Sequence, residues 1–437
     1  MRQVWIFLTF IGWLWSSSAQ AILTIEITEG VDGALPIAVL PFSWQGKGAA
    51  PEDIAAIIAA DLQRSGRFAP LDIKQTDTQA TSKAAVDFKL WRGRGIDHLL
   101  VGKVLPAKQG KYTVQFQLFD AIKGEQLAGY SMSAEDKHLR QLAHRVSDIV
   151  FESLLGVPGA FDTKIAYVTA TEKNRQRSYQ LAVADADGVN EQIILSSKQP
   201  LMSPSWSPDG QRLAYVSFEN KRPQIFVQTI NSGKREMVAS NAGLNNAPTW
   251  SPDGTRLAMT LSQDGNAEIY VLNLANKRQH RITRHYAIDT EASWAPDGKS
   301  LVFTSDRGGR PQLYQIKLDS QGRRQASPKR LSFQGNYNSR AVYSADGERL
   351  AFVHGKDGRF TIAVMDLKRG SMLVVADTRL GESPSFAPNG MMVIYAAEKD
   401  GKGVLEAVSV EGRARQRLGL QTGDVREPAW SPYLSKR

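Results

Sequence analysis

The pentapeptide Trp250-Ser251-Pro252-Asp253-Gly254 is one copy of a repeat that fills the second half of the chain. A large aromatic residue opens each copy, at spacings of 44, 44, 49, 43 and 44 residues: Trp206, Trp250, Trp294, Tyr343, Phe386 and Trp430. A turn sequence follows the first five, because proline presets φ at the first corner of a type I turn, Asp or Asn suits the second and glycine closes it. Two copies deviate at one position each, Ala345 in place of the proline and Asn389 in place of the aspartate.

The repeat continues beyond the turn. Apolar residues lie seven and nine positions after each of the first five aromatic residues, as at Leu257 and Met259, and this period of two predicts one face of a strand. A third strand is predicted to begin 19 positions after the aromatic residue, as at Ile269, and a fourth follows it. Four short antiparallel strands in about 44 residues is the size of a propeller blade.

The number of copies predicts how the ring closes. An extra copy of the second-strand pattern, Ile165-Ala166-Tyr167-Val168, has no aromatic strand before it, and the last aromatic strand, at Trp430, has no partner after it. We therefore predict that residues 156–437 form a six-bladed all-β propeller closed by the C-terminal strand, which leaves no free sheet edge at the seam. The longer spacing of 49 places five extra residues near 320–327, in one outer hairpin.

Residues 22–155 lack this repeat and are predicted to form an α/β N-terminal domain. Strands are expected at 37–40, 99–102 and 112–118, and helices at 52–64 and 139–155, the second ending at Gly156. Before them, Arg2, an uncharged run over 4–15 and Ala19-Gln20-Ala21 are typical of a signal peptide cleaved after residue 21. The mature chain would then be exported and begin at Ile22; an uncleaved anchor is the alternative.

Composition narrows the classes of function. The 437 residues carry a formal net charge of +10 and contain no cysteine, which excludes disulfides, thiolate metal sites and cysteine nucleophiles. Four of five basic pairs, including Lys234-Arg235 and Lys277-Arg278, fall before a fourth strand, where positive charge discourages edge-to-edge pairing. Attraction to an anionic envelope surface is the alternative, and we expect no nucleic-acid partner for an exported protein.

The sequence contains no recognisable catalytic motif. It has no Gly-x-Ser-x-Gly elbow, no glycine-rich phosphate loop and no His-Glu-x-x-His. The histidine pairs, such as His138 and His144, do not have the four-residue spacing of helical zinc ligands. Asp185-Ala186-Asp187-Gly188 begins like a calcium loop, lacks the later ligands and predicts a hairpin turn. We therefore expect no enzyme activity, no cofactor and no metal site in these segments.

The residues just before each aromatic position are expected to surround the mouth of the central channel. They include Ser203 and Arg340, and three positions offer carboxylates, Glu291, Glu382 and Glu427. A solvated loop rim is one interpretation; a recognition surface is the other, because rigid scaffolds present binding residues on their loops. A divalent cation held by these carboxylates is a further alternative.

The whole arrangement resembles the TolB family of periplasmic propeller proteins, which belong to the Tol-Pal system. The resemblance covers the signal sequence, the N-terminal domain, six repeats and the ending Pro428-Ala429-Trp430-Ser431-Pro432-Tyr433-Leu434. It implies that the propeller mouth binds the lipoprotein Pal, and that the start of the mature chain and the N-terminal domain engage TolA. The implied function is to support outer-membrane invagination during cell division and envelope integrity.

Carried onto this chain, the implied Pal face includes Asn245, Asn246, Ala247, Thr290 and Glu291, and Glu382 and Glu427 complete the predicted set at the mouth. The implied TolA segment is Ile22-Leu23-Thr24-Ile25-Glu26-Ile27. Ile25 and Ile27 alternate with polar residues, as a strand added to a partner's sheet needs. The resemblance also implies a periplasmic monomer that is peripheral to the outer membrane through Pal.

Two other functions remain open at this point. One is an exported enzyme with a propeller filter, such as a peptidase, although about 130 residues before the propeller leave little room for a hydrolase domain. The other is a glycan-binding propeller, which should stack sugars on exposed aromatic rings. The repeated tryptophans are instead expected within blades, where packing explains them.

Overall fold

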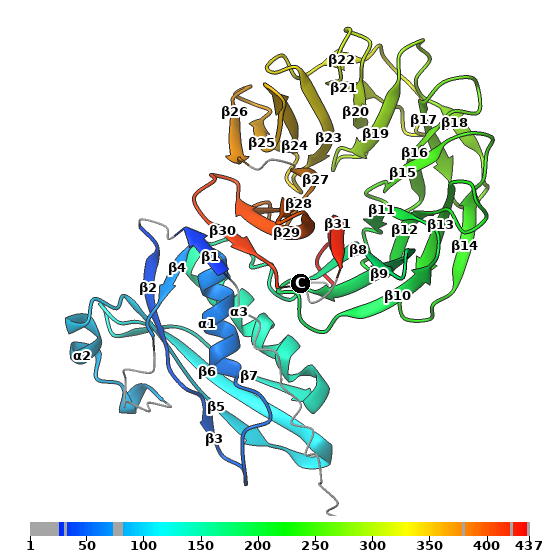
Figure 1. Cartoon of the computed structure of the whole chain (residues 1–437). Helices are drawn as coiled ribbons and strands as arrows, with labels where there is room; N and C mark the ends of the chain where they lie inside the picture. Colours follow the sequence, from blue (N-terminus) through cyan, green and yellow to red (C-terminus); the bar gives the residue numbers. More distant parts are fainter. Residues whose placement is uncertain (1–25, 30–32, 73–81, 378–380, 420–422, 435–437) are drawn as a thin grey trace, which may run out of the picture.

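A computed structural model describes residues 26–29, 33–72, 82–377, 381–419 and 423–434, and shows two bodies joined side by side (Figure 1). The first is an α/β domain and the second is a β-propeller, so the predicted fold class is confirmed. Within the described residues, no helix is long and apolar enough to cross a membrane. The predicted signal peptide, residues 1–21, lies outside the described part of the chain.

The N-terminal domain is built on one mixed sheet in the order β4-β2-β5-β6-β7, with β3 also paired to β5. Its strands are β2 (Leu35–Val39), β3 (Ser43–Trp44), β4 (Phe68–Pro70), β5 (His98–Pro106), β6 (Lys111–Asp120) and β7 (Glu125–Glu135). Its helices are α1 (Ile54–Arg64), α2 (Phe88–Gly93) and α3 (Leu139–Leu155), with short 3-10 turns η2 (Lys83–Ala85), η3 (Lys108–Gly110) and η4 (Asp136–His138).

Alternation along the strands divides the core between the two faces of this sheet. Leu100 faces α1 and α3, where it packs with Ile58 and Val146. Leu99 belongs to the other face and packs with Trp91 of α2, which is fully buried. Helix α3 ends at Gly156, whose φ of 71° is the left-handed conformation that glycine adopts without penalty at a helix end.

The propeller consists of six antiparallel sheets arranged in a ring (Figure 1). The first of three consecutive blades contains β11 (Leu201–Trp206), β12 (Arg212–Ser217), β13 (Gln224–Thr229) and β14 (Arg235–Ala239). The next contains β15 (Asn245–Trp250), β16 (Arg256–Leu261), β17 (Glu268–Asn273) and β18 (Gln279–Arg281). The third contains β19 (Asp289–Trp294), β20 (Ser300–Ser305), β21 (Gln312–Lys317) and β22 (Lys329–Arg330).

Two further blades follow along the chain. One contains β23 (Tyr337–Tyr343), β24 (Arg349–Lys356), β25 (Arg359–Asp366) and β26 (Met372–Ala376). The other contains β27 (Glu382–Phe386), β28 (Met392–Lys399), β29 (Lys402–Ser409) and β30 (Arg415–Arg417).

The sixth blade joins the two ends of the propeller. Strand β31 (Asp424–Trp430) pairs with β8 (Lys164–Lys173), which continues into β9 (Gln176–Asp185) and β10 (Gln192–Ser197). The predicted closure by the C-terminal strand is therefore confirmed. The extra residues of the 49-residue spacing also lie where predicted, in the long connection between β21 and β22.

The repeated pentapeptide forms the turn between the first and second strand of a blade. In the β15–β16 turn, the Ser251 hydroxyl donates to Asp253 Oδ1 at 2.5 Å and accepts from the Arg256 amide at 3.0 Å. Gly254 has a φ of 68°, which favours glycine. Trp250 packs against Ala214 and Val216 of the preceding blade, so the aromatic residue joins neighbouring blades.

The basic pairs that precede a fourth strand lie, as predicted, at the start of β14 or in the connections that lead to β18, β22 and β26. Lys277 of one such connection donates to Glu236 at 2.6 Å, which links two neighbouring blades. The charge is thus placed beside outermost strands, where it counters edge-to-edge pairing.

Candidate functional site

A ring of six left-handed residues surrounds the channel at the end where the inner strands begin. One residue of each inner strand has a φ between 47° and 56°, and we call these six the mouth ring: Ser203, Ala247, Glu291, Arg340, Ser383 and Glu427. Each lies three positions before the repeated aromatic residue. Residues other than glycine rarely adopt this conformation, and a set that shares it marks a built feature of the fold.

The left-handed residues are bulges in the innermost strands. In β15 the pairing with β16 skips between Asn246 and Thr249, and the same slip occurs at the matching place in the other inner strands. A bulge leaves one residue out of the ladder and turns its side chain and amide away from the regular sheet. The amides of the mouth ring therefore bond across blades, as from Arg340 to Thr304 Oγ1 at 3.1 Å.

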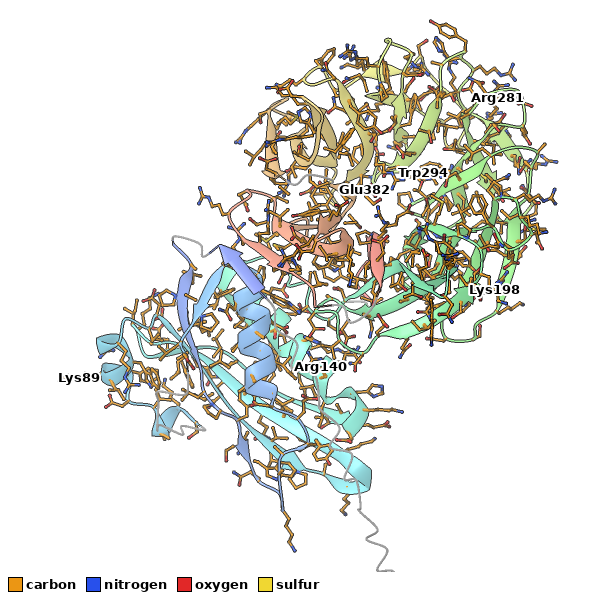
Figure 2. All side chains as sticks on the ribbon, viewed as in Figure 1. Lys89, Arg140, Lys198, Arg281, Trp294 and Glu382 are labelled. Atoms are coloured by element: carbon orange, nitrogen blue, oxygen red, sulfur yellow. The ribbon has the colours of Figure 1, made fainter. Side chains whose placement is uncertain are left out.

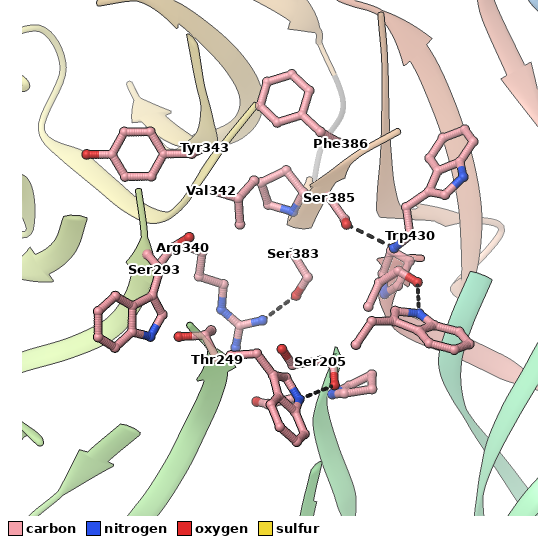
Figure 3. Close-up of a pocket in the computed structure, with 18 of the residues that line it drawn as sticks. Ser205, Thr249, Ser293, Arg340, Val342, Tyr343, Ser383, Ser385, Phe386 and Trp430 are labelled. Carbon is pink, nitrogen blue, oxygen red and sulfur yellow. Dashed lines mark hydrogen bonds between the residues drawn. The ribbon is translucent and has the colours of Figure 1, made fainter. Parts of the chain in front are cut away.

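Arg340 lies at the centre of the polar network in the mouth ring. One of its Nη atoms donates to the Ser383 hydroxyl (Figure 3). Its Nε donates to Glu291 Oε1 at 2.8 Å, and the same Nη lies 3.9 Å from Glu427 Oε1. Burial alone would lower the pKa of the guanidinium, but the carboxylates of Glu291 and Glu427 raise that pKa. Arg340 therefore stays charged and holds positive charge between two acids.

The two carboxylates of this network are fixed by further hydrogen bonds. The hydroxyl of Thr304 donates to Glu291 Oε2 at 3.1 Å, and the amide of Ser203 donates to Glu427 Oε2. Their side chains are only 20% and 13% exposed. Because Arg340 already supplies the positive charge here, a divalent cation between Glu291 and Glu427 would have to displace its guanidinium.

Below the mouth ring, the channel is a cavity of about 420 Å³ whose lining extends to the pentapeptide turns at Ser207 and Pro208. Prolines follow the mouth ring in four inner strands, and hydroxyl groups come next, including Ser205, Thr249, Ser293 and Ser385. Several hydroxyls are already used: Thr249 donates to the Ala292 carbonyl at 2.8 Å and Ser385 accepts from the Trp430 amide at 2.9 Å. The channel therefore has a charged entrance and a less polar interior.

The structure brings together four of the residues predicted at the mouth. Asn246, Ala247, Glu291 and Glu427 all line the channel. Asn246 Oδ1 also accepts from the hydroxyl of Ser203 at 3.4 Å, across two blades.

The other predicted mouth residues lie away from the channel lining. Asn245 is fully buried and bonds with its side chain to both backbone groups of Asn241. The Thr290 hydroxyl lies 3.3 Å from that of Thr260. The Glu382 carboxylate lies 3.6 Å from Arg426, also on an inner strand, and its charge helps to raise the pKa of Arg340.

Ser383 belongs to the mouth ring and was not among the predicted mouth residues. The position three before each aromatic residue would have identified it, since Phe386 places that position at Ser383.

A second candidate contact region is the segment that follows the predicted signal peptide. Strand β1 (Glu26–Glu29) pairs antiparallel with β30 and becomes the fifth strand of that blade (Figure 1). Of the predicted segment, Glu26 and Ile27 lie in β1, whereas Ile22, Leu23, Thr24 and Ile25 lie outside the described residues. The described end of the segment, Glu26 and Ile27, therefore pairs by its backbone with the outermost strand of a propeller blade.

Comparisons with known proteins agree with both halves of the fold. Residues 23–127 match the family model of the TolB amino-terminal domain, and residues 151–434 match that of the TolB beta propeller domain. Together they cover most of the chain.

Relatives of similar length carry one shared name. A protein of Thioalkalivibrio sulfidiphilus is 55% identical over 418 residues, 95% of each chain, and one of Xanthomonas euvesicatoria is 55% identical over 414 residues, 94% of this chain and 93% of that one. Both are named Tol-Pal system protein TolB. The crystal structure of TolB from Acinetobacter baumannii superposes with a TM-score of 0.85 at 39% identity, over 94% of this chain and all of that one.

Proposed function

Because the chain belongs to the TolB family, we propose that it is a non-catalytic scaffold of the Tol-Pal system that binds Pal at its propeller mouth and TolA through the start of its mature chain. The observation that carries the proposal is the mouth ring, in which six strained backbone positions fix polar groups around one opening. Backbone strain of about 1–3 kcal/mol per residue persists where the surrounding structure over-determines it, typically at binding sites.

The chemistry of the mouth ring suits a protein partner. Arg340 and Glu291 form a half-buried ion pair beside the small side chains of Ala247 and Ser203, so the surface offers both signs of charge next to room for an inserted side chain. Fixed groups of both signs orient a partner and reject surfaces with the wrong charges. The network uses its acids to hold Arg340, which leaves no free base or nucleophile among the mouth-ring residues.

The position of β1 supports the second contact. Backbone pairing of β1 with the edge of β30 is strand addition within one chain, and the same segment can make the same kind of pairing with a partner's sheet. We propose that the segment Ile22–Ile27 exchanges between these two edges. TolA would then compete with β30 for the same backbone groups.

In this proposal the protein acts in the periplasm as a monomer that reaches the outer membrane through Pal. It would thereby support outer-membrane invagination during cell division and the integrity of the envelope. Neither role requires a cofactor, since all contacts are between protein surfaces.

Binding of Pal can be tested by titration calorimetry with the cognate Pal periplasmic domain. The Ala247→Arg variant places a long cation in the mouth ring beside Arg340 and should abolish measurable binding. Glu348→Arg is the matched control, because it adds a cation on the exposed turn at the opposite end of the same inner-strand layer. Equal binding by both variants would refute the proposed site, and absence of binding by the unchanged protein would refute the proposed partner.

Binding of TolA is tested separately with the mature chain lacking residues 22–27. This deletion should abolish binding to the TolA periplasmic domain and leave Pal binding intact. Retained TolA binding would contradict the proposed exchange of β1.

A further inference from the structure

Five titratable side chains lie together where the N-terminal domain meets the propeller, four of them buried and Arg140 partly exposed. Four come from helices of the first domain, Asp61 and Arg64 from α1 and Arg140 and His144 from α3; the fifth, Asp187, comes from the β9–β10 turn of the propeller. Asp61, His144 and Asp187 are each at most 4% exposed, and Arg64 is 6% exposed. Arg140 is labelled in Figure 2, where it lies at the junction of the two domains. We call these five residues the junction cluster.

Asp187 is the propeller's contribution to the junction cluster. It accepts a hydrogen bond from Arg140, lies 3.7 Å from Arg64 Nη1 and is oriented by the Val189 amide at 3.1 Å. Burial alone would raise the pKa of Asp187, but Arg64, His144 and Arg140 lower that pKa to about 2. Asp187 is therefore an anion held almost entirely by cations of the other domain.

His144 lies between one carboxylate of each domain. Its Nδ1 is 2.8 Å from Asp61 Oδ2, and its Nε2 is 3.7 Å from Asp187 Oδ2 and has no hydrogen-bond partner. A neutral imidazole carries one N–H, so one of its nitrogens would turn a lone pair toward an anionic oxygen. A doubly protonated ring instead presents an N–H to both carboxylates, and this geometry favours the cation.

The surrounding charges act on His144 in opposite directions. Burial disfavours the charged ring and lowers its pKa, Arg64 also lowers it, and Asp61 and Asp187 raise it. The net direction is upward from the usual 6.5. Two more charged groups lie near the His144 ring: Arg140, from α3, and Glu52, from the segment before α1, whose charge acts on Arg140.

Three oxygen and nitrogen ligands of the junction cluster lie close enough together to suggest a metal site. The two arginines argue against that use, because Arg64 Nη2 lies 2.9 Å from Asp61 and Arg140 donates to Asp187. A divalent ion would bring two further charges between guanidinium groups that already neutralise both carboxylates. Arg64 and Arg140 thus already occupy the positions beside Asp61 and Asp187 that a metal ion would take.

We propose that the junction cluster is a pH-sensitive latch that fixes the N-terminal domain to the propeller, with His144 as its titrating member. The protonated ring bridges Asp61 and Asp187, so docking of the two domains is strongest below the ordinary histidine pKa. Docking weakens as the pH rises through the raised pKa of the docked state, because the ring then loses its proton and with it the positive charge that attracts Asp187 across the junction. The latch acts at the domain junction and does not depend on Pal or TolA.

The absence of native cysteine makes the latch directly measurable in the full chain. Dyes placed at Lys89→Cys on α2 and Lys198→Cys on the propeller report the distance between the domains by single-molecule energy transfer (Figure 2). With the unchanged junction cluster, the distribution of inter-dye distances should be narrow at pH 5.5 and should broaden as the pH rises above 7. His144→Gln should remove this pH dependence, and Asp187→Asn should broaden the distribution at every pH.

The matched control is Glu411→Gln, which removes the partner of Arg67 in an exposed ion pair across the same junction. This variant should keep the pH profile of the unchanged protein. A direct readout is the NMR titration of the His144 ring, whose pKa should lie above 6.5 and fall in Asp187→Asn.

Three outcomes would overturn the proposal. One is a pH-independent distribution in the unchanged protein, and the second is an unaltered pH profile in His144→Gln. The third is a distribution that narrows with added Zn²⁺ and broadens with a chelator at constant pH, which would make the junction cluster a metal site.

Discussion

At the scale of single residues, the six mouth-ring positions adopt a left-handed backbone conformation that is unfavourable for residues other than glycine, although none of them is glycine. Ala247 has a φ of 47°, and Cβ crowding makes that conformation costly for any residue but glycine. A β-branched side chain is more costly still in this conformation. The left-handed conformation belongs to a bulge: Asn245 and Asn246 stay paired with β16, and the register shifts between Asn246 and Thr249, which lets Ala247 face the mouth.

Two substitutions at Ala247 isolate this strain. Ala247→Val should lower the free energy of unfolding by about 1–2 kcal/mol, whereas Ala247→Gly should leave it unchanged or slightly higher, because glycine adopts positive φ freely. Denaturant unfolding of both variants measures the difference. Equal effects would mean that the left-handed backbone at this position carries no strain.

The ion pair between Arg340 and Glu291 is also testable as a pair. Both side chains are less than one third exposed, so we expect a coupling of about 1 kcal/mol in a double-mutant cycle with Arg340→Met and Glu291→Gln. Thermal unfolding of the two single variants and the double variant gives this value. Simple additivity would show that the pair orients the mouth without stabilising it.

At the scale of elements, the pentapeptide turn and its tryptophan hold each blade to the next. Trp250 is 7% exposed, its Nε1 donates to the Ser205 carbonyl at 3.1 Å, and Arg212 lies 4.5 Å from its ring centre. Trp250→Ala should cost about 3–5 kcal/mol, and Trp250→Phe, which loses mainly the hydrogen bond, about 1–2 kcal/mol. Denaturant unfolding that ranks the two variants equally would contradict this division between packing and bonding.

The aspartate of the same turn predicts a dependence of stability on pH. Burial alone would raise the pKa of Asp253, but hydrogen bonds from Ser251 and Thr255 and the charge of Arg256 lower it from 3.8 to about 2. A lowered pKa in the folded state stabilises the protein above pH 4, and this contribution is lost as the pH falls toward 2. The difference in melting temperature between the unchanged protein and Asp253→Asn should therefore shrink between pH 4 and pH 2. A constant difference over that range would show that the charge of Asp253 contributes nothing.

The sequence predicts elements well where a local pattern repeats, and poorly where pairing decides the structure. The blade strands follow from the spacing of residues such as Trp250 and Leu257, and the end of α3 follows from Gly156. The bulge at Ala247 was missed because nothing in an alanine signals positive φ. Strand β7 and helix α2 were missed as well, since their polar faces give only a weak periodic signal.

At the scale of the whole molecule, two long-range contacts determine the architecture. Strand β31 pairs with β8 across most of the chain, and Asp187 reaches the helices of the other domain. The first was predictable by counting incomplete blades. The second was not, because Asp187 lies in a segment whose composition predicts only a turn, and its partners Arg140 and His144 are far away in sequence.

Ring closure can be tested at this scale by removing residues 424–437. The deletion leaves β8 with an unpaired edge and exposes Tyr167, which is fully buried in the closed ring. We expect a lower melting temperature and concentration-dependent association of the free edge, measured by calorimetry and sedimentation. A monomer with the unchanged melting temperature would show that closure adds nothing to stability.

The central claim, that the mouth ring is the face that binds Pal, is tested most directly by hydrogen exchange of the unchanged protein with and without the Pal periplasmic domain. We predict slower exchange on binding in the segments 241–247 and 284–291, which lead into the mouth ring, and unchanged exchange in the turns 251–255 and 344–348 at the opposite end of the channel. Protection confined to those turns, or absent from both ends, would contradict the claim.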